Sequence, residues 1–312
     1  MKDKLVTLIG GGGFVGRYVT QELLRAGARV RVVERRPRDA WFLKPLGGLG
    51  QTQFVAGDIT QAQTITRAVQ GSDAVVNLVG ILSGDFQAVH VAGARNVAAA
   101  ARVAGVESLL HVSALGADIE SGSAYGRSKA EGERAVREAF PAATIFRPSL
   151  MFGREDAFVN RFAGMIASAP VVPVLRGSVR FQPVYVADVA QAVVAALADS
   201  GAHGGRTYEL GGPDILSMAE LFRWIAGAIG RDPSFVELPD ALGGMIAAFG
   251  FLPGAPITGD QWRMLQRDNV VSAGAEGIDA FGITPTPLAS VAPTWLVRFR
   301  RHGRFGRVGE AA

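Results

Sequence analysis

A run of four glycines, Gly10 to Gly13, constrains this chain more than any other feature of its sequence. The run follows the short apolar segment Leu5–Ile9 and precedes an amphipathic segment, so we expect a strand before the turn and a helix after it. Side chains at these positions would hold a diphosphate away from the backbone N–H groups and positive dipole end of that helix. We therefore predict a nucleotide loop, with an ordinary flexible turn as the alternative. Its expected contacts are Gly10, Gly12, Gly13, Phe14, Val15 and Gly16.

Short β-branched segments alternate with longer amphipathic segments through the first half of the chain. This alternation predicts an α/β fold built on a Rossmann doubly wound parallel sheet. The expected strands are Leu5–Ile9, Arg29–Val33, Gln53–Ala56, Ala74–Leu78, Ser108–Val112 and Ala143–Phe146. The expected helices of this half are Val15–Ala26, Ile65–Val69, Val89–Ala104 and Tyr125–Ala139.

The pattern loosens beyond Pro148 into segments that proline and glycine interrupt. We expect residues 1–150 to form the Rossmann domain, completed by residues of about 180–212. Residues 151–179 and 213–312 then form a smaller C-terminal α/β lobe. Helical patterns occur here at Phe158–Ala167, Asp188–Ala198, Met218–Ile229 and Gln261–Gln266.

The composition excludes several classes of site. The 312 residues contain no cysteine, which rules out disulfides, thiolate metal sites and cysteine nucleophiles. The four histidines lack ligand spacing, so we expect no metal site. A formal charge of +4 is too small an excess to indicate a nucleic-acid partner. The longest uncharged stretch, Ala241–Gly259, contains Pro253 and Pro256, so we expect no transmembrane helix.

Charged residues follow the second expected strand, where a dinucleotide fold places the group that meets the adenosine ribose. A carboxylate at Glu34 would accept a hydrogen bond from a free 2′-hydroxyl and favour NAD, whereas Arg35 or Arg36 would pair with a 2′-phosphate and favour NADP. We expect NADP(H) rather than NAD(H). The alternative is a solvated charge cluster at the end of a strand.

The residues that follow the next two expected strands, the third and the fourth, are also positioned to contact this ligand. Asp58, followed by Ile59, would face the adenine amino group. The segment after the fourth strand, Asn77 to Gly80, would line the nicotinamide ribose through Leu78, Val79 and Gly80.

Tyr125 and Lys129 lie four residues apart on an expected helix and therefore share one face. An ammonium group beside a phenol favours the phenolate and lowers the pKa of the tyrosine, which would let it exchange a proton with a substrate oxygen. Ser113, at the end of a strand, would hydrogen-bond the same oxygen. The alternative is a tyrosine packed over a surface lysine.

These features resemble the extended and atypical short-chain dehydrogenase/reductases, also grouped as NAD-dependent epimerase/dehydratase-like proteins. The resemblance rests on the glycine loop, the segment 111–113, the Tyr125-x-x-x-Lys129 pair and the segment 146–149, which contains Pro148. It implies an NAD(P) cofactor on a Rossmann sheet. It places the family's catalytic serine, tyrosine and lysine on Ser113, Tyr125 and Lys129, with Tyr125, Lys129 and Pro148 also near the cofactor.

A narrower resemblance covers nearly the whole chain. Residues 49–51, 152–160 and 260–265 are similar to those of the dehydrogenase-like accessory subunits of respiratory complex I, and the chain resembles a bacterial relative of that family. The resemblance implies a tightly held structural NADPH and a second lobe that leans on the membrane-facing part of the complex. Neighbouring families are linked to ubiquinone synthesis. Glu34 departs from an NADP pattern, while Arg35 matches the family's arginine.

Two functions therefore stay open. The chain is either a cofactor-binding accessory protein of complex I or a stand-alone NAD(P)-dependent reductase or epimerase that uses Ser113, Tyr125 and Lys129 on a small-molecule carbonyl or hydroxyl of unknown identity. We expect a cytoplasmic protein, with a peripheral place on the inner face of the membrane as the alternative.

Two further segments have alternative interpretations. The basic run Arg298–Arg307 would rest on an anionic surface or be a solvated tail, and Ala241–Phe251 would be a membrane-facing patch or be buried in the lobe.

Overall fold

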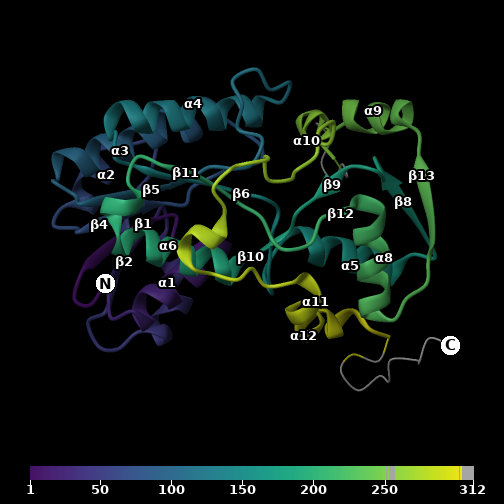
Figure 1. The fold of residues 1–312 in the computed structure, drawn as a ribbon, viewed down its shortest axis with the longest axis horizontal. Coiled ribbons are helices and arrows are strands. Elements are labelled where there is room, and N and C mark those ends of the chain that lie inside the picture. Colours follow the sequence, from purple (N-terminus) through teal and green to yellow (C-terminus); the bar gives the residue numbers. More distant parts are fainter. Residues whose placement is uncertain (251, 253–256, 302, 304–312) are drawn as a thin grey trace. The chain divides into compact units, whose positions relative to one another are not determined.

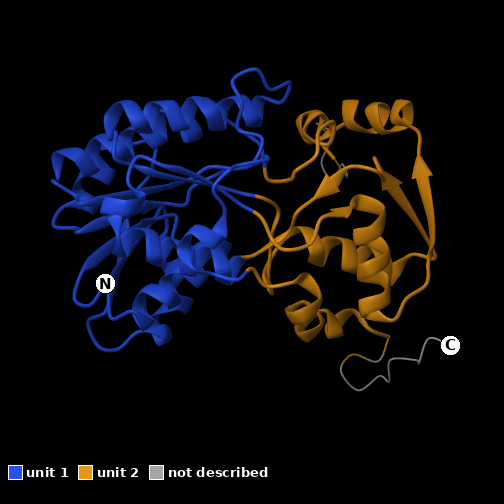
Figure 2. Ribbon diagram, viewed as in Figure 1, with its two compact units in different colours: residues 1–148, 186–210, 272–284 blue, residues 149–185, 211–271, 285–312 orange. Residues whose placement is uncertain are grey.

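The computed structural model describes residues 1–250, 252, 257–301 and 303, which divide into two compact units (Figure 2). Unit 1 consists of Met1–Pro148, Val186–Leu210 and Ser272–Thr284. Unit 2 consists of Ser149–Tyr185, Gly211–Val271 and Pro285–Ala312.

A parallel sheet of seven strands forms the centre of unit 1, in the order β11-β6-β5-β4-β1-β2-β3 (Figure 1). Strand β1 pairs with β2 on one side and with β4 on the other, so the direction of winding reverses at β1. The predicted α/β class with a doubly wound Rossmann sheet is confirmed. The strands are β1 (Leu5–Ile9), β2 (Arg29–Glu34), β3 (Thr52–Ala56), β4 (Ala74–Asn77), β5 (Ser108–Val112), β6 (Thr144–Pro148) and β11 (Thr207–Leu210).

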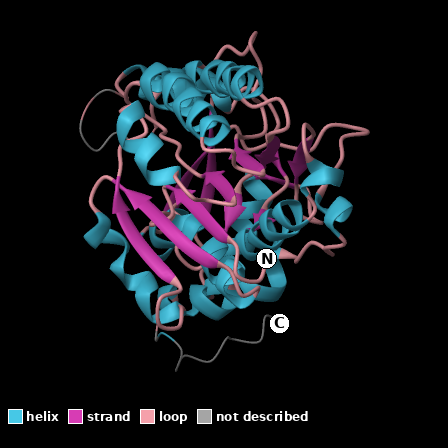
Figure 3. Cartoon of the chain, turned by 90° about the vertical axis from the view of Figure 1, so that its left-hand side faces the viewer, coloured by secondary structure: helices cyan, strands magenta, loops and turns pink. Residues whose placement is uncertain are grey.

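Helices cover both faces of this sheet, as Figure 3 shows from the side of unit 1. Helices α2, α3 and α4 pack together on one face, and α1 packs with α6 on the other. Apolar side chains of α2 and α3, such as Ile65 and Val97, meet Val75 and Leu109 of the sheet in a buried core. The helices of unit 1 are α1 (Phe14–Arg25), α2 (Ala62–Val69), α3 (Ala94–Val103), α4 (Ala124–Ala139), α6 (Val186–Ala198) and α7 (Ser200–His203).

Two local structures of unit 1 differ from the sequence prediction. The expected helix Val89–Ala104 begins instead as a π-helix, Gln87–Gly93, and continues as α3. A Cβ on Gly132 of α4 would be 2.2 Å from the carbonyl oxygen of His90, which shows how closely this segment packs against α4. A 3₁₀ helix, Pro37–Leu46, follows β2 in a segment for which no helix was predicted.

The described residues of unit 2 form three small two-stranded sheets: β7 with β10, β9 with β12, and β8 with β13. Its core is rich in aromatic side chains, among them Phe152, Phe181 and Phe222. The strands are β7 (Met151–Phe152), β8 (Val171–Leu175), β9 (Arg180–Phe181), β10 (Val184–Tyr185), β12 (Leu216–Ser217) and β13 (Ser234–Leu238). The helices are α5 (Phe158–Ser168), α8 (Met218–Ile229), α9 (Asp240–Ala248), α10 (Gly259–Met264), α11 (Leu288–Val291) and α12 (Pro293–Leu296).

The apolar stretch Ala241–Phe251 and the basic run Arg298–Arg307 both belong to unit 2. Helix α9 buries Gly243 and Ala247 but exposes Leu242 and Met245, so the stretch Ala241–Phe251 is only partly buried. Phe251 lies outside the described residues, as do residues 302 and 304–307 of the basic run. Within the described part of the chain, no helix combines the length and apolarity needed to cross a bilayer.

Candidate dinucleotide site

The glycine loop joins β1 to α1 and depends on the absence of side chains. Gly10 has a φ of +82°, a conformation that favours glycine, and a Cβ there would lie 2.8 Å from a methyl group of Val79. A Cβ on Gly16 would lie 2.3 Å from the carbonyl oxygen of Gly11. The loop is therefore folded tightly against the first turn of α1, and Gly10 and Gly16 are required by the fold itself.

Gly13 has a different role, because the fold leaves room for a side chain at this position. A Cβ on Gly13 would make an ordinary contact of 3.4 Å with the carbonyl oxygen of Gly10. Gly13 is the N-cap of α1, so no side-chain oxygen accepts from the N–H groups of the first turn, which also contains no acidic residue. Free N–H groups and the helix dipole make this end of α1 suited to an anion.

A cavity of about 490 Å³ opens beside the loop at the carboxyl ends of β1 to β4. Ten of the predicted cofactor contacts line it, namely Gly10, Gly12, Gly13, Glu34, Arg35, Asp58, Ile59, Leu78, Val79 and Gly80. The predicted contacts outside its lining are Phe14, Val15, Gly16, Arg36, Tyr125, Lys129 and Pro148. Lining residues that the sequence prediction missed are Ile9, Val33, Asp39, Gly57, Thr60, Ile81 and Val89.

Glu34 is held inside the loop at the adenosine end of this cavity. Its carboxylate accepts a hydrogen bond of 2.7 Å from the backbone N–H of Gly12. Burial raises the pKa of Glu34, and this hydrogen bond and the charge of Arg35 oppose the shift. The carboxylate therefore supports the loop in addition to facing the cavity.

The two arginines after Glu34 occupy different surroundings. Arg35 lines the cavity, and its charge acts on both Glu34 and Asp58. Arg36 lies outside the lining with an exposed side chain, and its Nε is 3.1 Å from Asp39 Oδ2. Of these two arginines, Arg35 alone lines the cavity.

Asp58 is fixed at the end of β3 by its own turn. Its Oδ1 accepts hydrogen bonds from the backbone N–H and the hydroxyl of Thr60, at 2.9 and 2.7 Å. These bonds lower the pKa of Asp58, so it lines the cavity as a carboxylate. At the next strand end, Asn77 accepts from the N–H of Val79 at 3.2 Å and so shapes the segment that leads to Gly80.

Lys129 connects α4 to the end of β5 and to Gly80. The side chain is 4% exposed, and its Nζ donates a hydrogen bond of 3.3 Å to the carbonyl oxygen of Val112, the residue before Ser113. A Cβ on Gly80 would lie 3.3 Å from this Nζ. Burial lowers the pKa of Lys129 to about 8. The lysine is thus a buried cation beside a residue that lines the cavity.

The expected effect of Lys129 on Tyr125 is wrong in this structure. The Nζ of Lys129 lies 5.9 Å from the centroid of the Tyr125 ring. Burial raises the pKa of Tyr125 to about 12 rather than lowering it. Spacing along the helix placed the two residues on one face correctly, but the sequence did not show that burial would raise the pKa of the phenol.

Ser113 and His111 leave polar atoms buried without partners among the described residues. The Oγ of Ser113 and the Nε2 of His111 are both inaccessible and unbonded. The two residues are separated by two positions along β5 and its end, so their side chains point to the same face. Asn77 donates to His111 Nδ1 at 3.1 Å, which leaves the proton of a neutral ring on Nε2. Buried polar atoms of this kind need a hydrogen-bond partner that the described residues do not supply.

His90 lies in the π-helix, with its ring against that of Tyr125. Its Nε2 accepts from the N–H of Ile81 at 3.0 Å, so its Nδ1–H donates to Ser128 Oγ at 2.9 Å, and that hydroxyl donates to the carbonyl of Tyr125 at 2.8 Å. Burial and the charge of Lys129 lower its pKa to about 3. His90 thus holds the first turn of α4 in place as a neutral ring.

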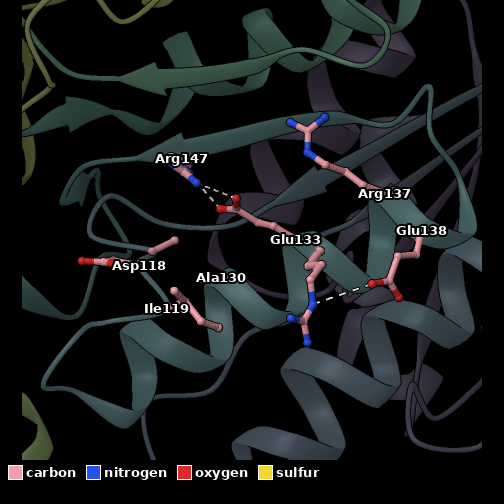
Figure 4. Close-up of a pocket in the computed structure, with 9 residues that line it drawn as sticks. Asp118, Ile119, Ala130, Glu133, Arg137, Glu138 and Arg147 are labelled. Carbon is pink, nitrogen blue, oxygen red and sulfur yellow. Dashed lines mark hydrogen bonds and ion pairs between the residues drawn. The ribbon is translucent and has the colours of Figure 1, made fainter.

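A second cavity, of about 640 Å³, lies in unit 1 between α4, β6 and residues 117–119 (Figure 4). Its arginines are already paired. Arg147 makes two hydrogen bonds with Glu133, at 2.9 and 2.7 Å, as Figure 4 shows. Arg134 pairs with Glu138. Arg137 donates to the carbonyl of Gly205. This cavity therefore offers no unpaired arginine to an anionic ligand.

The residues of unit 1 fit a dinucleotide better than a metal. Within residues 1–250, 252, 257–301 and 303, no three His, Asp or Glu side chains lie close enough to hold a metal ion. The first cavity is lined by the backbone of Gly13 at the start of α1 and by Arg35, and a buried lysine lies beside Gly80, which also lines it. These are the features that an extended anionic cofactor needs.

Comparisons with known proteins place the chain in a family. The model of the NAD dependent epimerase/dehydratase family matches residues 6–211. The chain is 38% identical over 307 residues to NADH dehydrogenase (ubiquinone) 1 alpha subcomplex subunit 9, mitochondrial, of Mus musculus, over 96% of this chain and 81% of that one. It is 31% identical over 300 residues to a ceramide reductase of Caulobacter vibrioides, over 89% of this chain and 90% of that one.

The fold also matches a solved structure. An NADPH-dependent quinone oxidoreductase from Escherichia coli, in complex with NADPH, superposes with a TM-score of 0.76 at 21% identity, over 93% of this chain and 99% of that one. At this identity the likeness concerns the fold alone. The family match and the relative from Mus musculus confirm the two resemblances predicted from the sequence.

Proposed function

The chain belongs to the NAD dependent epimerase/dehydratase family, and we propose that it binds NADP(H) in unit 1 and serves as an accessory subunit of respiratory complex I. NAD(P) binding is the property of the family. The preference for NADP(H), the residues that hold it and the association with complex I are the parts that need testing. The cavity beside the glycine loop is the observation that carries the proposal.

The residues of the cavity have separate tasks in holding the cofactor. The N–H groups at the start of α1 would bind the diphosphate next to Gly13. Arg35 and Asp58 would hold the adenosine end, and Lys129, beside Gly80, would hold the nicotinamide ribose. A bound nicotinamide would supply or accept a hydride. In an accessory subunit the cofactor would instead stabilise the folded state by binding to it alone.

The preference for NADP(H) rests on the contrast between Glu34 and Arg35. Glu34 is engaged by the N–H of Gly12, while Arg35 faces the cavity. We expect Arg35→Glu to weaken NADPH binding about 10-fold or more, with a much smaller effect on NADH, because only NADPH carries the 2′-phosphate. Arg36→Glu is the matched control, since Arg36 itself lies outside the cavity lining, with its side chain exposed. Equal effects of the two variants would contradict this assignment.

Association with complex I is supported by the relative from Mus musculus, which carries the name of a subunit of that complex. Such a subunit would lie peripherally on the inner face of the membrane. Native electrophoresis of gently solubilised source membranes, with a tag on this chain, tests the association. We expect the tagged chain to migrate with active complex I. A small free species would contradict the accessory role.

A stand-alone reductase is the second candidate, and the unpartnered Oγ of Ser113 favours it. In this function Ser113 would hydrogen-bond a carbonyl oxygen of the substrate and Tyr125 would donate the proton. The printed name of the relative from Caulobacter vibrioides, a reductase, supports the same chemistry. We expect Tyr125→Phe to abolish carbonyl-dependent NADPH oxidation while changing NADPH affinity less than about two-fold. Unchanged activity in this variant would exclude the candidate.

A further inference from the structure

An exposed apolar segment of unit 1, outside the cavity lining except for Asp39, lies between β2 and β3. It consists of the 3₁₀ helix Pro37–Leu46 and the turn 47–51 that follows. Trp41, Phe42 and Leu46 are each more than 40% exposed, and Leu49 is fully exposed. We call the surface formed by these four side chains the aromatic patch. Isolated exposed apolar residues are ordinary, but four within nine positions form a cluster that indicates a partner surface.

Buried residues of the same 3₁₀ helix hold the aromatic patch against unit 1. Leu43 and Ala40, in the same 3₁₀ helix, are completely buried. Because these two residues anchor the helix, the neighbouring Trp41 and Phe42 are directed outward. The turn that carries Leu49 is rich in glycine, and Gly50 has a φ of +77° with open space around it. Leu49 is thus presented at the tip of a turn by backbone geometry.

Cations surround the aromatic patch. The Nζ of Lys44 lies 3.8 Å from the centroid of the Trp41 ring, and the guanidinium carbon of Arg17 lies 4.4 Å from that of Phe42. Arg38 also lies over Trp41, at 5.6 Å. Residues 35–51 contain four basic side chains and one acidic one, Asp39, which pairs with Arg36.

We propose that the aromatic patch docks on an anionic phospholipid bilayer. Exposed tryptophan and leucine side chains with interspersed lysine and arginine suit the boundary between headgroups and acyl chains, and the net positive charge complements acidic headgroups. The exposed residues of α9 are a poorer match, because the stretch 240–250 contains Asp240 and no basic residue. The inference deepens the peripheral location proposed above by naming its surface.

Sedimentation with lipid vesicles tests this surface separately from assembly with complex I, because the vesicles contain no protein. The intact chain is mixed with vesicles of phosphatidylcholine containing about one third phosphatidylglycerol, and with vesicles of phosphatidylcholine alone. We expect binding to the anionic vesicles only, weakened by added salt. Absence of binding to the anionic vesicles overturns the proposal. The proposed function is tested separately, by the NADPH titration and the native electrophoresis.

Matched variants locate the binding surface. Leu49→Glu should lower the partition onto anionic vesicles about 10-fold or more, whereas Val103→Glu, which makes the same change at a residue of α3 that is 82% exposed, should lower it less than about two-fold. Trp41→Ser provides a second variant of the patch. Equal losses for Leu49→Glu and Val103→Glu, or a loss confined to Met245→Glu on α9, would overturn the assignment. NADPH binding, measured on the same samples, verifies that each variant is folded.

Discussion

The glycine loop and the polar cluster, defined as Asn77, His90, His111, Ser113 and Lys129, lie at the carboxyl side of the same sheet but are built differently. In the loop, the backbone N–H groups of Gly10, Gly12 and Gly13 donate to Val33, Glu34 and Gly10 within the chain, and the N–H groups at the start of α1 stay available to an anion. In the cluster, two histidines and a lysine are buried with depressed pKa values, and two polar atoms have no partner among the described residues. The loop is therefore stable by itself. In the cluster, burying a charged lysine and unpartnered polar atoms destabilises the folded state, and a bound ligand would offset that cost.

The largest effect is expected where the loop cannot accept a side chain. Gly16→Ala should lower the free energy of unfolding by about 3 kcal/mol or more, because its Cβ would meet the backbone of Gly11 at 2.3 Å. Gly13→Ala should lower it by less than about 1 kcal/mol yet weaken NADPH binding about 10-fold or more, since its Cβ fits the fold but adds bulk on the cavity lining at the proposed diphosphate site. Urea unfolding and NADPH titration measure the two quantities.

Gly122→Ala is the control for both variants, because a Cβ there meets nothing within 4 Å. It should leave stability and NADPH affinity almost unchanged. If Gly13→Ala bound NADPH as tightly as the unaltered chain, the start of α1 would not be the diphosphate site.

The polar cluster should respond in the opposite direction. Lys129→Met should raise the free energy of unfolding at pH 7 by about 1–3 kcal/mol, because a pKa of about 8 means that the buried ammonium destabilises the folded state. The same variant should weaken NADPH binding about 10-fold or more. Thermal unfolding with and without NADPH measures both effects, and Lys2→Met is an exposed control. A loss of stability in Lys129→Met would show that the lysine is structural.

The two buried histidines predict a dependence of stability on acid. His90 and His111 have pKa values of about 3 in the folded chain and about 6.5 when unfolded, so the unfolded state binds more protons between these values. Stability should therefore rise as pH increases from 3 to 6.5, by about 1.4 kcal/mol per pH unit for each histidine. Urea unfolding at several pH values should show His111→Phe removing about half of this histidine contribution. An unaltered slope would mean that His111 is protonated in the folded chain.

The smallest effect concerns the serine whose hydroxyl has no partner. Ser113→Ala should change the free energy of unfolding by less than about 1 kcal/mol, because the hydroxyl makes no bond that the fold would lose. Ser128→Ala should cost about 1–2 kcal/mol, since its hydroxyl connects His90 to the carbonyl of Tyr125. Chemical unfolding of the two variants compares them directly, and a larger loss for Ser113→Ala would reveal a structural bond at that serine.

The sequence was most informative where one local requirement fixes both residue type and position. Gly10 and Gly16 were predicted as part of a nucleotide loop, and their backbone geometry explains why no other residue fits. The order of strands and helices in unit 1 was predicted for the same reason, because buried parallel strands and amphipathic helices have distinct periodicities. The switch point at β1 follows from that order.

What the sequence could not predict depends on residues far apart in the chain. The π-helix around His90 arises where this segment meets Gly132 of α4, and the high pKa of Tyr125 arises from burial. The unpartnered Nε2 of His111 is visible only once Asn77 is placed beside it. The 3₁₀ helix had one local signal, Pro37 at its first position, which alone does not distinguish it from a turn.

A titration of the intact chain with NADPH, followed by nicotinamide fluorescence, tests the central claim most directly. The account predicts saturable binding of one NADPH per chain, competed by NADP⁺ and weakened in the folded variants Gly13→Ala and Arg35→Glu. Absence of saturation, or binding that both variants leave unchanged, would contradict a dinucleotide site between the glycine loop and the ends of β2 to β4.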